Sequence, residues 1–112
     1  MTRILLCAAL LALAPLPAFA QAYVGTWSSD PAQCRNGQEV EDAPMIIKRD
    51  RYDQHETHCV FSGLRQRGDT WTGQEQCRVE GTSRRGRITL KATGDTLSID
   101  EGPGPRRLQR CR

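Results

Sequence analysis

The chain has 112 residues, of which 38% are hydrophobic and 26% charged, and its formal net charge is +3. This length is short for two domains of ordinary size. The balance of 16 bases against 13 acids is too even for the dominant basic face typical of nucleic-acid-binding proteins. We therefore expect one small domain and no nucleic-acid partner.

Residues 1–20 have the features of a secretory signal peptide, with Arg3, an apolar run and a final Ala-Phe-Ala before the expected cleavage site. The apolar run is too short for a membrane-spanning helix. Cys7 follows a leucine, whereas lipid-attachment sites have a small residue there, so no lipid anchor is expected. We predict a mature domain over 21–112 that is periplasmic or secreted and has no membrane span.

An even number of cysteines remains after cleavage: Cys34, Cys59, Cys77 and Cys111. In an exported chain this count predicts a disulfide framework. The intervals of 25, 18 and 34 residues contain no C-x-x-C pair of the kind that binds zinc. No metal and no other cofactor is expected.

The first predicted elements precede residue 50. Alternating residues over 21–28 predict a strand, which ends at Asp30-Pro31 because proline cannot donate into a ladder. Residues 32–44 are a polar loop with one short helical turn after Asp30-Pro31. A short apolar strand over 45–48 follows.

A central hairpin is predicted from strands over 52–63 and 70–80 around Gly68. With the turn centred on Gly68, Cys59 lies opposite Cys77, and Phe61 lies opposite Glu75. Period-2 alternation then directs Glu75 and Cys77 toward the core.

Three more strands are predicted over 88–92, 97–99 and 106–112, separated by turns at 82–86, 94–95 and 102–105. The pattern is typical of an all-β fold, a small antiparallel meander barrel of seven or eight short strands stapled by two disulfides. We expect its interior to be filled by bulky side chains: Trp27, Phe61, Trp71, Ile88, Leu90, Leu97 and Ile99.

Four cysteines allow three disulfide connectivities. A bond between the directly opposed Cys59 and Cys77 is disfavoured, because facing Cβ atoms lie about 4.5–5.5 Å apart and a disulfide needs about 3.8 Å. We predict Cys34–Cys59 with Cys77–Cys111, each contributing about 2–4 kcal/mol.

Two candidate sites are interpreted as non-catalytic. His55 and His58 would point to opposite faces of a strand, so no metal site is predicted there. Asp53 and His55 would instead face outward together and either contact a partner or form ordinary polar surface. Glu75 would be a buried acid, with Arg110 as its expected pair. No second carboxylate is predicted beside it, so we expect no enzyme.

Two resemblances bear on function. The Gly25-Thr26-Trp27 tripeptide resembles the G-x-W of lipocalin and avidin barrels, which implies a small-ligand binder as an alternative function. Four longer strings resemble a group of short exported alphaproteobacterial proteins: GTWSSDPAQC at 25–34, EDAPMII at 41–47, YDQHETHC at 52–59 and LQRC at 108–111. At least one member of that group is associated with inhibition of a periplasmic peptidoglycan-cleaving hydrolase.

That resemblance implies a binding protein that inhibits a lysozyme-like muramidase. The Ser-Gly-rich loop and the Y-x-x-x-T-K-G motif of the C-type lysozyme inhibitors are absent, so no inhibitory residue is carried over from them. Muramidase clefts use paired carboxylates, which arginines on rigid turns could engage. The predicted partner-binding residues are Asp53, His55, Arg65, Arg67, Arg84, Arg85, Arg106 and Arg107.

Overall fold

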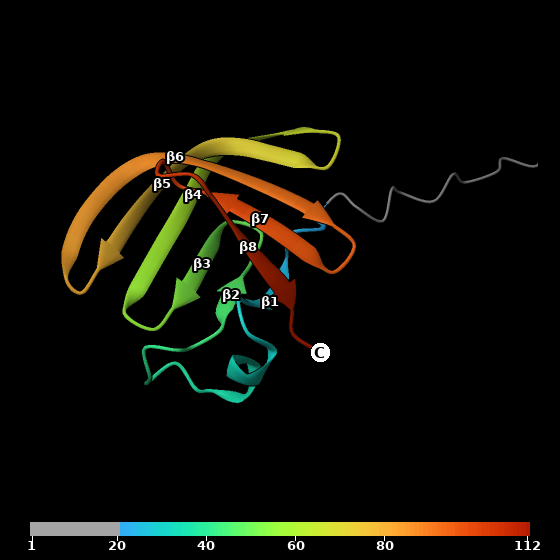
Figure 1. The fold of residues 1–112 in the computed structure, drawn as a ribbon. Coiled ribbons are helices and arrows are strands. Elements are labelled where there is room, and N and C mark those ends of the chain that lie inside the picture. Colours follow the sequence, from blue (N-terminus) through green and yellow to red (C-terminus); the bar gives the residue numbers. More distant parts are fainter. Residues whose placement is uncertain (1–20) are drawn as a thin grey trace, which may run out of the picture.

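A computed structural model describes residues 21–112; the predicted signal peptide lies outside them. Eight antiparallel strands close into a barrel in chain order, with β8 pairing back to β1. Figure 1 shows how they are arranged. The all-β meander barrel is thus confirmed. Its elements are β1 (Gly25–Ser28), the 3₁₀ turn η1 (Pro31–Arg35), β2 (Met45–Ile47), β3 (Arg51–Gln54), β4 (Thr57–Arg67), β5 (Thr70–Val79), β6 (Thr82–Thr93), β7 (Thr96–Asp100) and β8 (Pro105–Arg110).

The long β4–β5 hairpin has the predicted register from Thr57 to Ser62 of β4. Cys59 pairs with Cys77 and Phe61 with Glu75, and all four residues are buried. A bulge between Ser62 and Arg65 then shifts the pairing by one residue. Because side chains alternate along a strand, this shift reverses which face the later residues of β4 occupy.

A second hairpin lies where one strand was predicted over 52–63. The chain reverses between β3 and β4 at His55-Glu56, with His55 at a φ of 52°. The reversal carries no glycine or proline signal. Gln38, in the loop before β2, stabilises the reversal instead. Its side-chain oxygen accepts from the His55 backbone N–H at 2.7 Å, and its backbone carbonyl oxygen lies 2.9 Å from His55 Nδ1. The first strand also begins later than predicted, at Gly25.

The predicted disulfide connectivity is wrong. The structure joins Cys34 to Cys111, here called the terminal disulfide, and Cys59 to Cys77, the hairpin disulfide. The Cα atoms of the hairpin pair are only 4.0 Å apart. The Cα atoms of opposed residues in an antiparallel sheet lie about 4.5 Å apart at non-hydrogen-bonded positions and about 5.5 Å apart at hydrogen-bonded ones. The generic spacing that argued against this bond therefore overestimated the distance at this position.

Side chains fill the barrel interior. Its buried cluster includes Trp27, Tyr52 and Phe61, with the Tyr23 ring edge-on to Phe61 at 6.4 Å, and each member is at most 7% exposed. Arg110 covers the Trp27 ring at 4.2 Å and donates to the carbonyls of Ala22 and Val24. The expected pairing of Arg110 with Glu75 is therefore wrong. Among the described residues, no helix is long and apolar enough to cross a membrane.

Candidate functional site

The outer wall of β4–β6 carries a group of basic side chains. Within these three described strands, the outward positions hold six exposed bases and no acid. We call this set the basic face: Arg65, Arg67, Arg78, Arg85, Arg87 and Lys91. Every member is exposed, and none forms an ion pair with a described residue.

Strand register brings these bases together. Arg67 lies in one cross-strand row with Lys91, through Thr70 on β5, and Arg65 lies in the next row. Arg85 and Arg87 follow along β6, opposite glutamines of β5. Adjacent strands are about 4.8 Å apart and alternate residues of a strand about 6.7 Å, so the charges form one patch.

The bulge in β4 is what places Arg65 and Arg67 on this face. Before the bulge, the odd-numbered residues Cys59 and Phe61 point inward. After it, Arg65 and Arg67 pair with the outward residues Thr72 and Thr70. Without the extra residue, both arginines would point into the barrel.

The arginines predicted to bind a partner divide into two groups. Arg65, Arg67 and Arg85 belong to the basic face. Arg107 lies at its margin, across a shallow depression of about 440 Å³ from Lys91. Arg84 and Arg106 point to the opposite side of the wall, toward a pair of carboxyl groups. Arg78, Arg87 and Lys91 were not predicted, and only the register places them with the others.

A groove adjoins the basic face on the outer wall of β4 and β5. Its volume is about 410 Å³, and it is lined by His58, Val60, Ser62, Gln76 and Arg78. Val60 is 55% exposed, which is high for a valine. The groove continues past His58 and Arg78 into a second depression of about 560 Å³ at the end of the hairpin. An apolar spot beside a basic patch is typical of protein-binding surfaces.

Asp53 and His55 each contact other residues of the chain rather than each other. Asp53 Oδ1 lies 2.8 Å from Arg51 and 2.6 Å from His58 Nδ1. Partial burial acts to raise the pKa of Asp53, but hydrogen bonds from Arg51 and His58 hold it below the usual value. His55 is occupied in bracing the loop through Gln38. It is His58, oriented by Asp53, that lines the groove.

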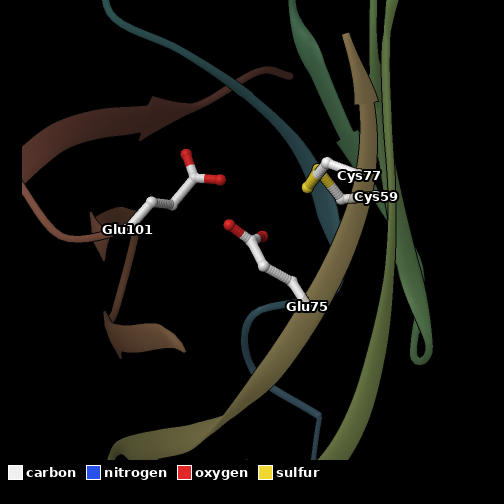
Figure 2. Close-up of side chains that lie close together, drawn as sticks. All are labelled: Cys59, Glu75, Cys77 and Glu101. Atoms are coloured by element: carbon white, nitrogen blue, oxygen red, sulfur yellow. A yellow bond between two sulfur atoms is a disulfide. The ribbon is translucent and has the colours of Figure 1, made fainter. Parts of the chain in front are cut away.

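A pair of glutamates lies at the mouth of the barrel, beside the hairpin disulfide (Figure 2). The Glu75 side chain is fully buried, and that of Glu101 is 13% exposed. Arg84 bridges them, donating to Glu75 Oε1 at 3.0 Å and to Glu101 Oε2 at 3.1 Å. Tyr52 and Arg106 also donate to Glu101, at 2.7 and 3.1 Å. Glu75 Oε2 is buried and has no partner among the described residues.

The two glutamates differ in charge. Burial, followed by hydrogen bonding with Glu101 and its negative charge, raises the pKa of Glu75 to about 8. Burial also acts on Glu101, but hydrogen bonds from Glu75, Tyr52 and Arg84 hold its pKa below the usual value. At neutral pH the pair therefore shares one proton, which resides on Glu75.

The prediction that no second carboxylate lies beside Glu75 is wrong. Glu101 follows β7 and is 26 residues away in the chain, so no local pattern links the two. The pair nevertheless does not favour acid–base catalysis, because a catalytic acid must reach a substrate and the Glu75 side chain has no exposed surface.

Comparisons with known proteins leave the functional argument to the geometry. A scan of protein-family models, a search of curated proteins and a search of solved structures gave no significant match to this chain.

Proposed function

We propose that this protein is a periplasmic, non-enzymatic binding protein that inhibits a peptidoglycan-cleaving hydrolase by docking its basic face on the acidic cleft of that enzyme. The observation that carries the proposal is the basic face, where six exposed bases share the outer wall of β4–β6 without an acid. The two disulfides are consistent with an extracytoplasmic protein.

The chemistry of a muramidase cleft suits such a face. Lysozyme-like enzymes work with a pair of carboxyl groups, and guanidinium groups bind carboxylates with two parallel hydrogen bonds. A hydrogen-bonded barrel gives these side chains a rigid backbone support, so little backbone entropy is lost when the partner docks. A patch of one sign also accelerates association with an oppositely charged surface.

The alternative is a small-ligand binder of lipocalin type, suggested by the tripeptide at Gly25. Such a protein would need space inside its barrel. Here the interior positions are occupied by side chains that are at most 7% exposed, with Trp27 completely buried. A filled interior favours recognition through the outer surface.

A turbidity assay on peptidoglycan tests the proposal. Residues 21–112 in molar excess should slow clearing by an endogenous lytic enzyme or by a c-type lysozyme. The double reversal Arg85→Glu with Arg87→Glu should weaken inhibition about tenfold, or about 1.4 kcal/mol. The matched control is Lys48→Glu with Arg49→Glu, which makes the same charge change at exposed positions off the face.

Two outcomes would refute the proposal. One is undiminished clearing by both enzymes with no detectable complex. The other is an equal loss of inhibition in the two double variants, because that would trace the effect to net charge rather than to the basic face.

A further inference from the structure

The two cysteines of the hairpin disulfide lie close to two glutamates, and all four residue types can ligate a metal ion. One side-chain donor atom from each of Cys59, Cys77, Glu75 and Glu101 lies within 4.8 Å of the other three. Figure 2 shows the Glu75 carboxyl group between Glu101 and the two sulfurs. We propose that the reduced form of this protein binds Zn²⁺ through these four residues, and that the zinc site and the hairpin disulfide are mutually exclusive states.

The geometry is close to what zinc requires. Zinc bonds of about 2.0–2.3 Å in a tetrahedron place neighbouring ligand atoms roughly 3.3–3.8 Å apart. Starting from atoms within 4.8 Å, the carboxyl oxygens would move inward by about 1 Å. The sulfurs would separate by side-chain rotation once the bond between them is broken.

Both carboxyl groups have an oxygen available for the metal. Glu75 Oε2 is buried and accepts no hydrogen bond from a described residue. Glu101 Oε1 accepts from Arg106 alone among the contacts found, which leaves it one lone pair. In the reduced protein, coordination to a cation would give the buried Glu75 oxygen a partner.

The surroundings compensate the charge of such a site. Two thiolates and two carboxylates around Zn²⁺ carry a net charge of −2. Arg84 contacts both glutamates and Arg106 contacts Glu101, which supplies two positive charges. Together with the Tyr52 hydroxyl they also fix the orientation of the carboxyl groups, as outer hydrogen bonds do in known zinc sites.

Reduction must come first, because both sulfurs are bonded to each other in this structure. A dithiol reductant supplies two electrons and two protons, becomes a disulfide itself, and leaves thiols on Cys59 and Cys77. Zinc then displaces one proton from each thiol, and Glu75 and Glu101 coordinate it as carboxylates.

The test uses residues 21–112 carrying Cys34→Ser and Cys111→Ser, so that the hairpin cysteines are the remaining thiols. A trialkylphosphine reduces them, taking oxygen from water and forming its oxide, and Co²⁺ serves as the spectroscopic probe for zinc. We expect one equivalent of Co²⁺ to give thiolate charge-transfer and intense tetrahedral d–d bands, which Zn²⁺ abolishes.

The controls separate this site from simple thiol binding. Oxidised protein should give no bands. Glu75→Gln should bind at least tenfold more weakly, and Glu101→Gln should also weaken binding. If reduced protein loses its β-sheet circular dichroism, zinc should restore it.

Each opposite result overturns the proposal: bands in oxidised protein, no one-to-one complex after reduction, no recovery of structure with zinc, or thiolate bands that both glutamate substitutions leave unchanged.

Discussion

Replacing Glu75 by glutamine should change how stability depends on pH. The folded protein holds a proton on Glu75 up to about pH 8, whereas the unfolded chain releases it near the ordinary value of 4.5. The folded state therefore binds more protons between these limits. By linkage, this contribution is fully present below about pH 4.5 and is lost as pH rises toward 8.

The size of the effect follows from the shift. One unit of pKa difference corresponds to about 1.4 kcal/mol, so the ceiling over this window is about 5 kcal/mol. Arg84 stabilises the ionised form of Glu75, and the pKa of about 8 already includes this effect. We expect the free energy of unfolding to fall by roughly 1–3 kcal/mol between pH 5 and pH 8. Glu101 acts in the opposite sense, since its lowered pKa removes stability only as pH falls below the ordinary range.

Urea unfolding at pH 5, 6, 7 and 8, followed by the fluorescence of the buried Trp27 and Trp71, measures this dependence. Glu75→Gln keeps the shape and the acceptor for Arg84 but has no proton to lose, so its curve should be nearly flat. It should match the natural protein at pH 5 and exceed it at pH 8. Glu80→Gln, at an exposed turn, should leave the slope unchanged. A natural protein whose stability does not fall from pH 5 to 8, or a Glu75→Gln variant with the same slope, would refute the reasoning.

The remaining predictions concern stability and charge. Removing the terminal disulfide should lower the free energy of unfolding by about 4 kcal/mol, and removing the hairpin disulfide by about 3 kcal/mol, because they close loops of 77 and 18 residues. Urea titration of the two double-alanine variants measures both losses, and the reverse order would show that loop entropy is not the main effect. Arg110→Leu should lower the free energy of unfolding, measured in urea, by about 2–4 kcal/mol, because the stacking on Trp27 and two hydrogen bonds are lost. A loss under about 0.5 kcal/mol would show that these contacts do not stabilise the fold. Gly63→Ala should cost about 1 kcal/mol because its φ is +62°, while Gly86→Ala, also with open space at Cβ but without a positive φ, should cost nothing by the same measurement. On a sulfated resin, the double reversal in the basic face should elute at clearly lower salt than the matched control pair, and equal elution would argue against a localised patch.

The alternating pattern of the chain was sufficient to predict the meander and the inward position of Glu75, because a half-buried strand is recorded in adjacent residues. Features that depend on distant residues were not predictable in this way. The reversal at His55 depends on Gln38, which lies 17 residues earlier. The partners of Glu75 are Arg84 and Glu101, which only the closed barrel brings to its mouth.

The predicted disulfide connectivity was wrong for a different physical reason. The register was correctly predicted, so Cys59 and Cys77 were correctly placed opposite each other. The error lay in applying the general Cβ spacing of opposed residues, about 4.5–5.5 Å, to this pair. Antiparallel ladders alternate between wide and narrow pairs, and a Cα separation of 4.0 Å belongs with the narrow class.

The basic face shows how a single backbone irregularity can add charged side chains to a surface that overall composition does not reveal. A net charge of +3 suggests an even distribution, but none of the acids lies on the outward positions of β4–β6 within the described chain. Two of the six bases reach the face only because the bulge after Ser62 inserts a residue into β4. A regular strand would have placed Arg65 and Arg67 on the inner face of the hairpin, the side that Trp71 occupies. The bulge therefore adds two arginines to the outer wall of β4–β6.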